Sequence, residues 1–183
     1  DLEGASMVVK EIKTKTVRRK PKPPFITSTL QQAASTFCGF SPRRTMSIAQ
    51  RLYEGIDLGN GAEGLITYMR TDSFAIAQDA ENSCRELITK TYGKDYCPEK
   101  PNRYQSRSGA QEAHEAVRPT DVTRTPDAVK KHLSQPDYKL YRLIWERFVG
   151  SQMTPAVIEQ RTAVIDAGGD GAPGKPCYTF QAT

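Results

Sequence analysis

The sequence predicts a mainly α-helical domain that contains a helix-turn-helix or winged-helix-like unit and is flanked by strand edges of an adjoining β-rich domain. Helix start signals and apolar stripes recur between residues 25 and 155, as in amphipathic helices. Residues 1–24 and 156–183 instead contain interleaved Val, Ile and Thr, which is typical of strands. We therefore expect three parts: a strand edge and linker in 1–24, a helical domain in 25–155, and truncated return strands in 156–183.

Composition narrows the class of protein. The chain has 183 residues, a net charge of +5, 37% hydrophobic residues and 26% charged residues, which fits a soluble globular protein and excludes a disordered tail. The uncharged stretch over residues 25–42 is rich in Ser, Thr and Gln, so no membrane partner is expected. The four cysteines are far apart, without a C-x-x-C pair, so no metal site is expected in this chain.

The first expected element is an edge strand over residues 7–20, which ends at the Pro-rich segment 21–24. Seven basic and three acidic residues make residues 1–24 strongly positive. Within this run, Lys13 and Arg18 are candidate contacts to DNA phosphates. A solvated strand edge is the other interpretation, and the sequence favours it slightly.

Two short helices are expected next. Ser28 and Gln31 have the spacing of a capping box, which predicts a helix from 28 to 37 closed by Gly39. Ser41-Pro42 predicts a second helix that runs to Gly55. If this pair reads DNA, its candidate phosphate contacts are Arg43, Arg44 and Arg51, and the alternative function is a non-catalytic winged-helix DNA-binding module.

The remaining elements follow from glycine and proline breaks and from apolar periodicity. In chain order, the sequence predicts a loop over 56–64, a short strand over 65–71, a helix over 77–92, irregular chain over 93–125, helices over 125–133 and 136–153, and strands from 162 onward.

Tyr68 and Arg70 are the residues with the clearest chemical potential. On a strand their side chains would lie on one face, because side chains alternate with a period of two. A phenol beside a guanidinium suits attack on a phosphodiester, since the cation can hold a phosphate oxygen and favour the phenolate. Without further motifs, an exposed pair with no function is the more common interpretation.

Five segments in order change that interpretation: PPFITSTLQQAAS (23–35), TMSIAQRLYEG (45–55), LITYMRTDS (65–73), AQEAHEAVRPTD (110–121) and LIWERFVGSQMTPA (143–156). Together they resemble bacterial type IA DNA topoisomerases. The resemblance implies that Tyr68 attacks DNA and stays joined to a 5′ phosphate, and that Arg70 stabilises the phosphate. It implies that His114 contacts phosphate or relays a proton. Arg118 falls in the same motif, where a phosphate contact is the functional interpretation and a structural ion pair is the alternative. From its residue type and place after Arg70, Asp72 is expected to cap a helix or tether Arg70 in preference to binding a metal.

The resemblance also implies the cofactor and partners. Such enzymes cut one DNA strand, pass a strand and religate, relaxing negative supercoils without ATP. Magnesium would be held by an acidic domain that has no match in this chain, so the isolated chain is expected to be inactive. The expected partners are single-stranded DNA and sister domains of the same polypeptide. The expected location is the cytoplasm, on the nucleoid, with an organelle as the alternative.

Overall fold

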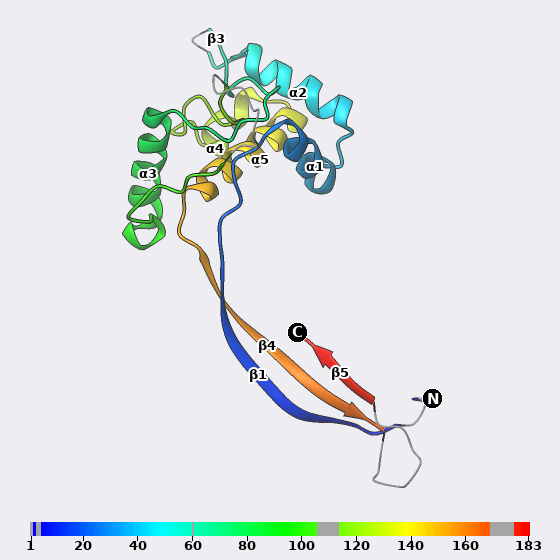
Figure 1. The fold of residues 1–183 in the computed structure, drawn as a ribbon. Helices are drawn as coiled ribbons and strands as arrows, with labels where there is room; N and C mark the ends of the chain where they lie inside the picture. Colours follow the sequence, from blue (N-terminus) through cyan, green and yellow to red (C-terminus); the bar gives the residue numbers. More distant parts are fainter. Residues whose placement is uncertain (1, 3–4, 60, 106–113, 169–177) are drawn as a thin grey trace. The chain divides into compact units, whose positions relative to one another are not determined.

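The computed structural model describes residue 2 and residues 5–59, 61–105, 114–168 and 178–183. The chain divides into two compact units, one formed by residues 1–20 and 155–183 and the other by residues 21–154. Figure 1 shows their elements. These limits lie beside the expected ones at residues 24 and 155. We describe each unit by itself.

The first unit is an antiparallel three-stranded sheet. Its strands are β1 (Met7–Arg19), β4 (Ala156–Ala167) and β5 (Tyr178–Ala182), in the order β1-β4-β5 (Figure 1). The predicted strand over 7–20 is confirmed. The strands from the two ends of the chain pair with each other, since β1 lies antiparallel to β4 from Met7↔Ala167 to Arg19↔Ala156. β4 also begins six residues before the predicted start at residue 162.

The second unit begins with the two predicted helices, α1 (Thr27–Cys38) and α2 (Pro42–Glu54). Gly39 ends α1 with φ of 69°, a left-handed conformation that glycine adopts without strain. Ser41 caps α2 by accepting a hydrogen bond from the Arg44 amide at 3.3 Å. The predicted Ser28–Gln31 capping box is wrong: Ile26 is the N-cap of α1, and its amide donates to Thr29 Oγ1 at 3.1 Å.

The segment after α2 differs from the prediction. The expected loop over 56–64 contains a hairpin of β2 (Ile56–Asp57) and β3 (Ala62–Glu63). The expected strand over 65–71 is absent from the described structure, where only an isolated bridge joins Ile66 to Pro119. The backbone hydrogen bonds of residues 65–71 go to several separate segments of the chain, so no continuous strand ladder forms.

The remaining helices are α3 (Gln78–Tyr92), α4 (Pro126–Val129) and α5 (Gln135–Ser151), with 3₁₀ turns η1 (Lys94–Tyr96) and η2 (Lys130–His132). All three predicted helical regions are confirmed. α5 packs against α1, α2 and α4. Its apolar face is buried as predicted and consists of Leu140, Tyr141, Ile144, Trp145, Phe148 and Val149.

Two further expectations concern the cysteines and membranes. Cys84 is buried on α3 as predicted, and burial raises the pKa of its thiol to about 12. The described cysteines, Cys38, Cys84 and Cys97, are free thiols, and Cys177 lies outside the described residues. Among the described helices, none combines the length and apolar character that a membrane span requires.

Candidate functional site

The segment from Tyr68 to Ser73 alternates strictly in exposure. Tyr68, Arg70 and Asp72 are exposed, whereas Met69, Thr71 and Ser73 are buried. Met69 is 1% exposed and Tyr68 is 43% exposed. Although no strand forms here, the alternation that the sequence suggested survives, and the chemically capable side chains lie on the surface.

Thr27, at the start of α1, fastens this segment from one side. Its hydroxyl lies 2.8 Å from the Met69 carbonyl oxygen and 3.1 Å from the Thr71 carbonyl oxygen, and it accepts a hydrogen bond from the Thr71 amide at 2.9 Å. The Thr27 amide also donates to the Thr71 carbonyl at 2.9 Å. The backbone on both sides of Arg70 is therefore tied to α1.

Thr67 fastens the segment from the other side. Its hydroxyl lies 2.7 Å from the Ala116 carbonyl oxygen and accepts from the Arg118 amide at 3.0 Å. The Thr67 amide donates to the Arg118 carbonyl at 2.9 Å, and the Val117 amide donates to the Phe25 carbonyl at 2.8 Å. The residues next to Tyr68 and Arg70 are thus held by two segments that are distant in sequence.

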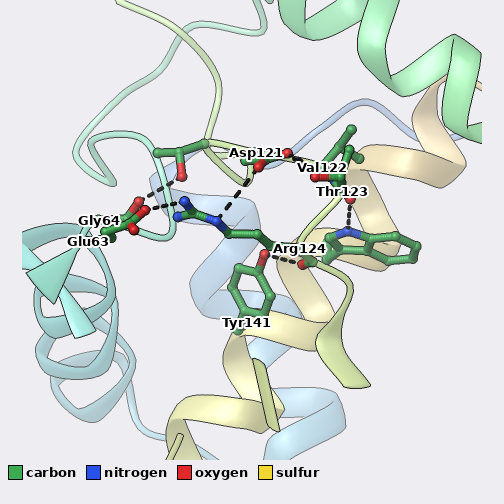
Figure 2. A network of polar contacts seen from close by, with 9 residues as sticks. Glu63, Gly64, Asp121, Val122, Thr123, Arg124 and Tyr141 are labelled. Atoms are coloured by element: carbon green, nitrogen blue, oxygen red, sulfur yellow. Dashed lines mark hydrogen bonds and ion pairs between the residues drawn. The ribbon is translucent and has the colours of Figure 1, made fainter. Parts of the chain in front are cut away.

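A polar network supports the chain that leads into this segment (Figure 2). Arg124 pairs with Glu63 of β3 and lies 3.7 Å from Asp121. Tyr141 of α5 donates to the Arg124 carbonyl at 2.7 Å, and burial raises the pKa of that phenol. The Thr120 hydroxyl donates to the Gly64 carbonyl at 2.7 Å. The network joins the hairpin, the 120–125 loop and the core helix.

Arg70 and His114 line the same hollow, of about 480 Å³, which also contains Asp72 and the N-terminal residues of α1. Within the described part of the chain, neither Arg70 nor His114 has a hydrogen-bond or ion-pair partner. The start of a helix presents free amides and the positive end of its dipole, which favour an anion. The hollow therefore combines a guanidinium, an imidazole and a helix start, a set that suits a phosphate.

Tyr68 and Asp72 have surroundings that differ from the expected ones. Tyr68 does not line this hollow; its ring instead contacts Tyr53 of α2 edge-on, with centroids 5.3 Å apart. Both expected roles for Asp72 are wrong. The N-cap of α3 is Ala77, and no ion pair joins Asp72 to Arg70 in the described structure.

The candidate DNA contacts occupy different environments. Arg118 is 8% exposed and donates to Glu115 at 2.6 Å and to the Pro119 carbonyl at 2.9 Å, so the structural ion pair is present. Arg51 is paired with Asp137 at 2.6 Å, and Arg44 lies 4.7 Å from the centre of the Phe40 ring. Arg43 is exposed on α2.

In the sheet unit, Lys13 and Arg18 are both exposed on β1. Lys13 lies 3.3 Å from Glu11. Residues 110–113 of the motif that contains His114 lie outside the described residues.

A magnesium site would need a cluster of oxygen ligands. The described residues contain no group of three or more His, Cys, Asp or Glu side chains that could hold a metal ion. The described residues therefore do not fit a magnesium ion.

Known proteins resemble this chain over nearly its whole length. A family model described as DNA topoisomerase matches residues 1–175. DNA topoisomerase 1 of Xylella fastidiosa is 51% identical over 96% of this chain and 21% of its own length. The enzyme of Helicobacter pylori is 49% identical over 90% of this chain and 23% of its own length.

A solved structure supports the same assignment. Full-length topoisomerase I from Thermotoga maritima has a TM-score of 0.73 and 38% identity to this chain, covering 97% of it and 28% of that protein. The chain therefore spans between 21% and 28% of the length of these relatives. Because the motifs, the family model over residues 1–175 and the solved fold over 97% of the chain agree, the chain belongs to the bacterial type IA DNA topoisomerase family.

Proposed function

We propose that this chain carries the nucleophile of a DNA topoisomerase that cuts one strand, passes a strand and religates, relaxing negative supercoils without ATP. The observation that carries the proposal is the clamped segment from Tyr68 to Ser73. It exposes a phenol and a guanidinium beside a hollow that contains His114 and the start of α1. The relatives named DNA topoisomerase 1 support DNA as the substrate.

The chemistry is a balanced exchange of one ester for another. Tyr68 Oη forms a bond to phosphorus and loses its proton, while the bond from phosphorus to the 3′ oxygen breaks and that oxygen gains a proton. Arg70 neutralises the phosphate, and His114 contacts the phosphate or relays a proton. The phosphotyrosine conserves the energy of the broken bond, so the 3′ hydroxyl can reverse the reaction.

The remaining assignments concern parts around this site. We place the magnesium site in an acidic domain elsewhere in the polypeptide, which would also be a partner of this chain, and the enzyme on chromosomal DNA in the cytoplasm. We describe α1, α2 and the β2–β3 hairpin as a winged-helix-like unit. In that unit Arg43 is the freest candidate for a phosphate contact, because Arg51 already binds Asp137.

The direct test is to map a covalent adduct. The whole enzyme, incubated with labelled single-stranded DNA and magnesium and then denatured, should retain label on one peptide. Digestion should locate that label at Tyr68, with a free 3′ hydroxyl on the released strand. Label on another residue, or a 3′ phosphate link, would contradict the proposal.

Arg70→Ala and His114→Ala in the whole enzyme should each lower DNA cleavage about tenfold or more, since tenfold corresponds to roughly 1.4 kcal/mol of barrier. The melting temperature should stay nearly unchanged, because neither side chain has a partner in the described structure. The control is Arg142→Ala, which removes an exposed arginine paired with Glu146 on α5. A large drop in melting temperature with normal cleavage would assign Arg70 and His114 to the fold.

The basic run of β1 makes a separate prediction. If Lys13, Lys15, Arg18 and Arg19 contact phosphates, exchanging all four for Gln should flatten the slope of log affinity against log salt by up to about 3, since each single-strand phosphate releases about 0.7 counterion. Preferred cleavage sites should not move, because phosphate contacts carry no sequence information. Lys90→Gln with Lys94→Gln is the control. An unchanged slope would make the run a solvated strand edge.

A further inference from the structure

Helix α1 carries a second surface with the chemistry of a nucleic-acid site. Along α1, from Thr29 to Phe37, a hollow of about 350 Å³ is also lined by Lys22 and Arg147. Phe37 is 73% exposed, the most exposed large hydrophobic side chain among the described residues. An aromatic ring left in water beside two cations has no use in the packing of this unit.

Arg147 is the half-buried cation of this hollow. Its guanidinium lies 4.2 Å from the centre of the Phe25 ring, and burial lowers its pKa. Half-buried cations are usually paired, because leaving water is costly. Yet Arg147 has no hydrogen bond or ion pair within the described residues, and the only other cation lining the hollow is the exposed Lys22. Its electrostatic neighbours are the Phe25 ring and the Tyr104 phenol, and neither is a carboxylate, so the guanidinium can still pair with a phosphate.

This hollow connects with the site already described. A third hollow, of about 480 Å³, shares Ser28 and Gln31 with the hollow of Arg70 and His114. It shares Gln32 and Thr36 with the hollow of Phe37. We name these three adjoining hollows the α1 track. Among the described residues that line the track, Asp72 is the only carboxylate.

The dimensions fit a short strand. α1 has 12 residues, which at about 1.5 Å per residue span roughly 18 Å. That length corresponds to at most about five nucleotides at the duplex spacing of ~3.4 Å per phosphate. A single strand suits the track better than a duplex, because only unpaired bases can stack on an exposed ring.

We propose that the α1 track binds a single-stranded stretch of the DNA substrate, with phosphates on Lys22 and Arg147 and a base stacked on Phe37. The proposal rests on the proposed function in one respect: the strand continues into the hollow of Arg70 and His114. The binding it describes is measured without cleavage, so the two can fail separately.

The test uses the 183-residue chain and a short fluorescein-labelled oligo(dT) strand, with binding followed by anisotropy. Phe37→Ala should weaken binding at least about fivefold, as expected for the loss of one stacked base, and Phe37→Trp should retain it. Tyr92→Ala, which removes a half-exposed aromatic of α3 outside the track, is the matched control and should change nothing. Lys22→Gln and Arg147→Gln should each lower the salt slope by about 0.7.

Each outcome decides the matter. Arg147 packs on Phe25, so the Arg147→Gln result counts only if the melting temperature is unchanged. If the melting temperature falls, Lys22→Gln and Phe37→Ala still test the proposal, because both side chains are exposed. Unchanged oligo(dT) affinity in both of these would overturn the proposal, as would an equal loss in Tyr92→Ala or an equal loss for a duplex of the same length. Missing adducts at Tyr68 with these effects intact would contradict the proposed function alone.

Discussion

Tyr68→Phe in the whole enzyme is expected to abolish the covalent DNA adduct and the relaxation of negatively supercoiled DNA. The substitution removes only the oxygen that would bond to phosphorus. The Tyr68 ring contacts Tyr53 edge-on at 5.3 Å, and a phenylalanine ring can keep that contact. Affinity for single-stranded DNA and the melting temperature should therefore be close to those of the unchanged enzyme.

Three measurements separate the chemistry of Tyr68 from DNA binding. Plasmid relaxation and adduct formation report the chemistry, and anisotropy with a labelled single strand reports binding. Tyr92→Phe, on α3, is the matched control and should leave all three unchanged. Relaxation by the Tyr68→Phe enzyme would exclude Tyr68 as the nucleophile. Duplex affinity that exceeds single-strand affinity would favour a non-catalytic winged-helix module.

Thr27→Val should reduce cleavage on the order of 100-fold, because the Thr27 hydroxyl holds the backbone on both sides of Arg70. Valine has nearly the shape of threonine but cannot bond to the Thr71 amide or the Met69 carbonyl, which Thr27 contacts at 2.9 Å and 2.8 Å. Leaving such groups unpaired costs about 1–3 kcal/mol. A shift of about 1 Å at a reacting group can cost roughly 100-fold in rate.

Two results would distinguish a positioning role for Thr27 from a simple loss of stability. Cleavage should remain low well below the melting temperature, and Thr27→Ser, which keeps the hydroxyl, should restore most of it. Thr89→Val is the control, because the Thr89 hydroxyl bonds only to the Arg85 carbonyl one turn back in α3, at 3.0 Å. Normal cleavage in Thr27→Val would show that the clamp is dispensable.

Local signals explain why the helices could be predicted from sequence. Ser41-Pro42 marked the start of α2 and the apolar stripe of α5 marked its buried face, and both depend on neighbours within a few residues. The motif around Tyr68 identified the family for the same reason, since it is a contiguous string.

The features that could not be predicted from the sequence depend on residues that are far apart along the chain. β-branched and aromatic residues over 65–71 predicted a strand, but their backbone groups bond to Leu52, Arg118 and Thr27 instead of to one partner strand. Thr27 lies 44 residues before Thr71, so no local pattern could mark it as part of the site. The same holds for the pairing of Glu63 with Arg124, 61 residues apart.

The pairing of β1 with β4 has a consequence for the order of folding. Partners in this ladder are 137 residues apart at Arg19↔Ala156 and 160 apart at Met7↔Ala167. Closing an open loop of the shorter length costs about 4 kcal/mol of chain entropy before any strand contact forms. Helical contacts are local and form much sooner. As the chain leaves the ribosome, residues 21–154 are thus expected to be compact first, with β1 waiting unpaired until β4 is synthesised and the ladder can close.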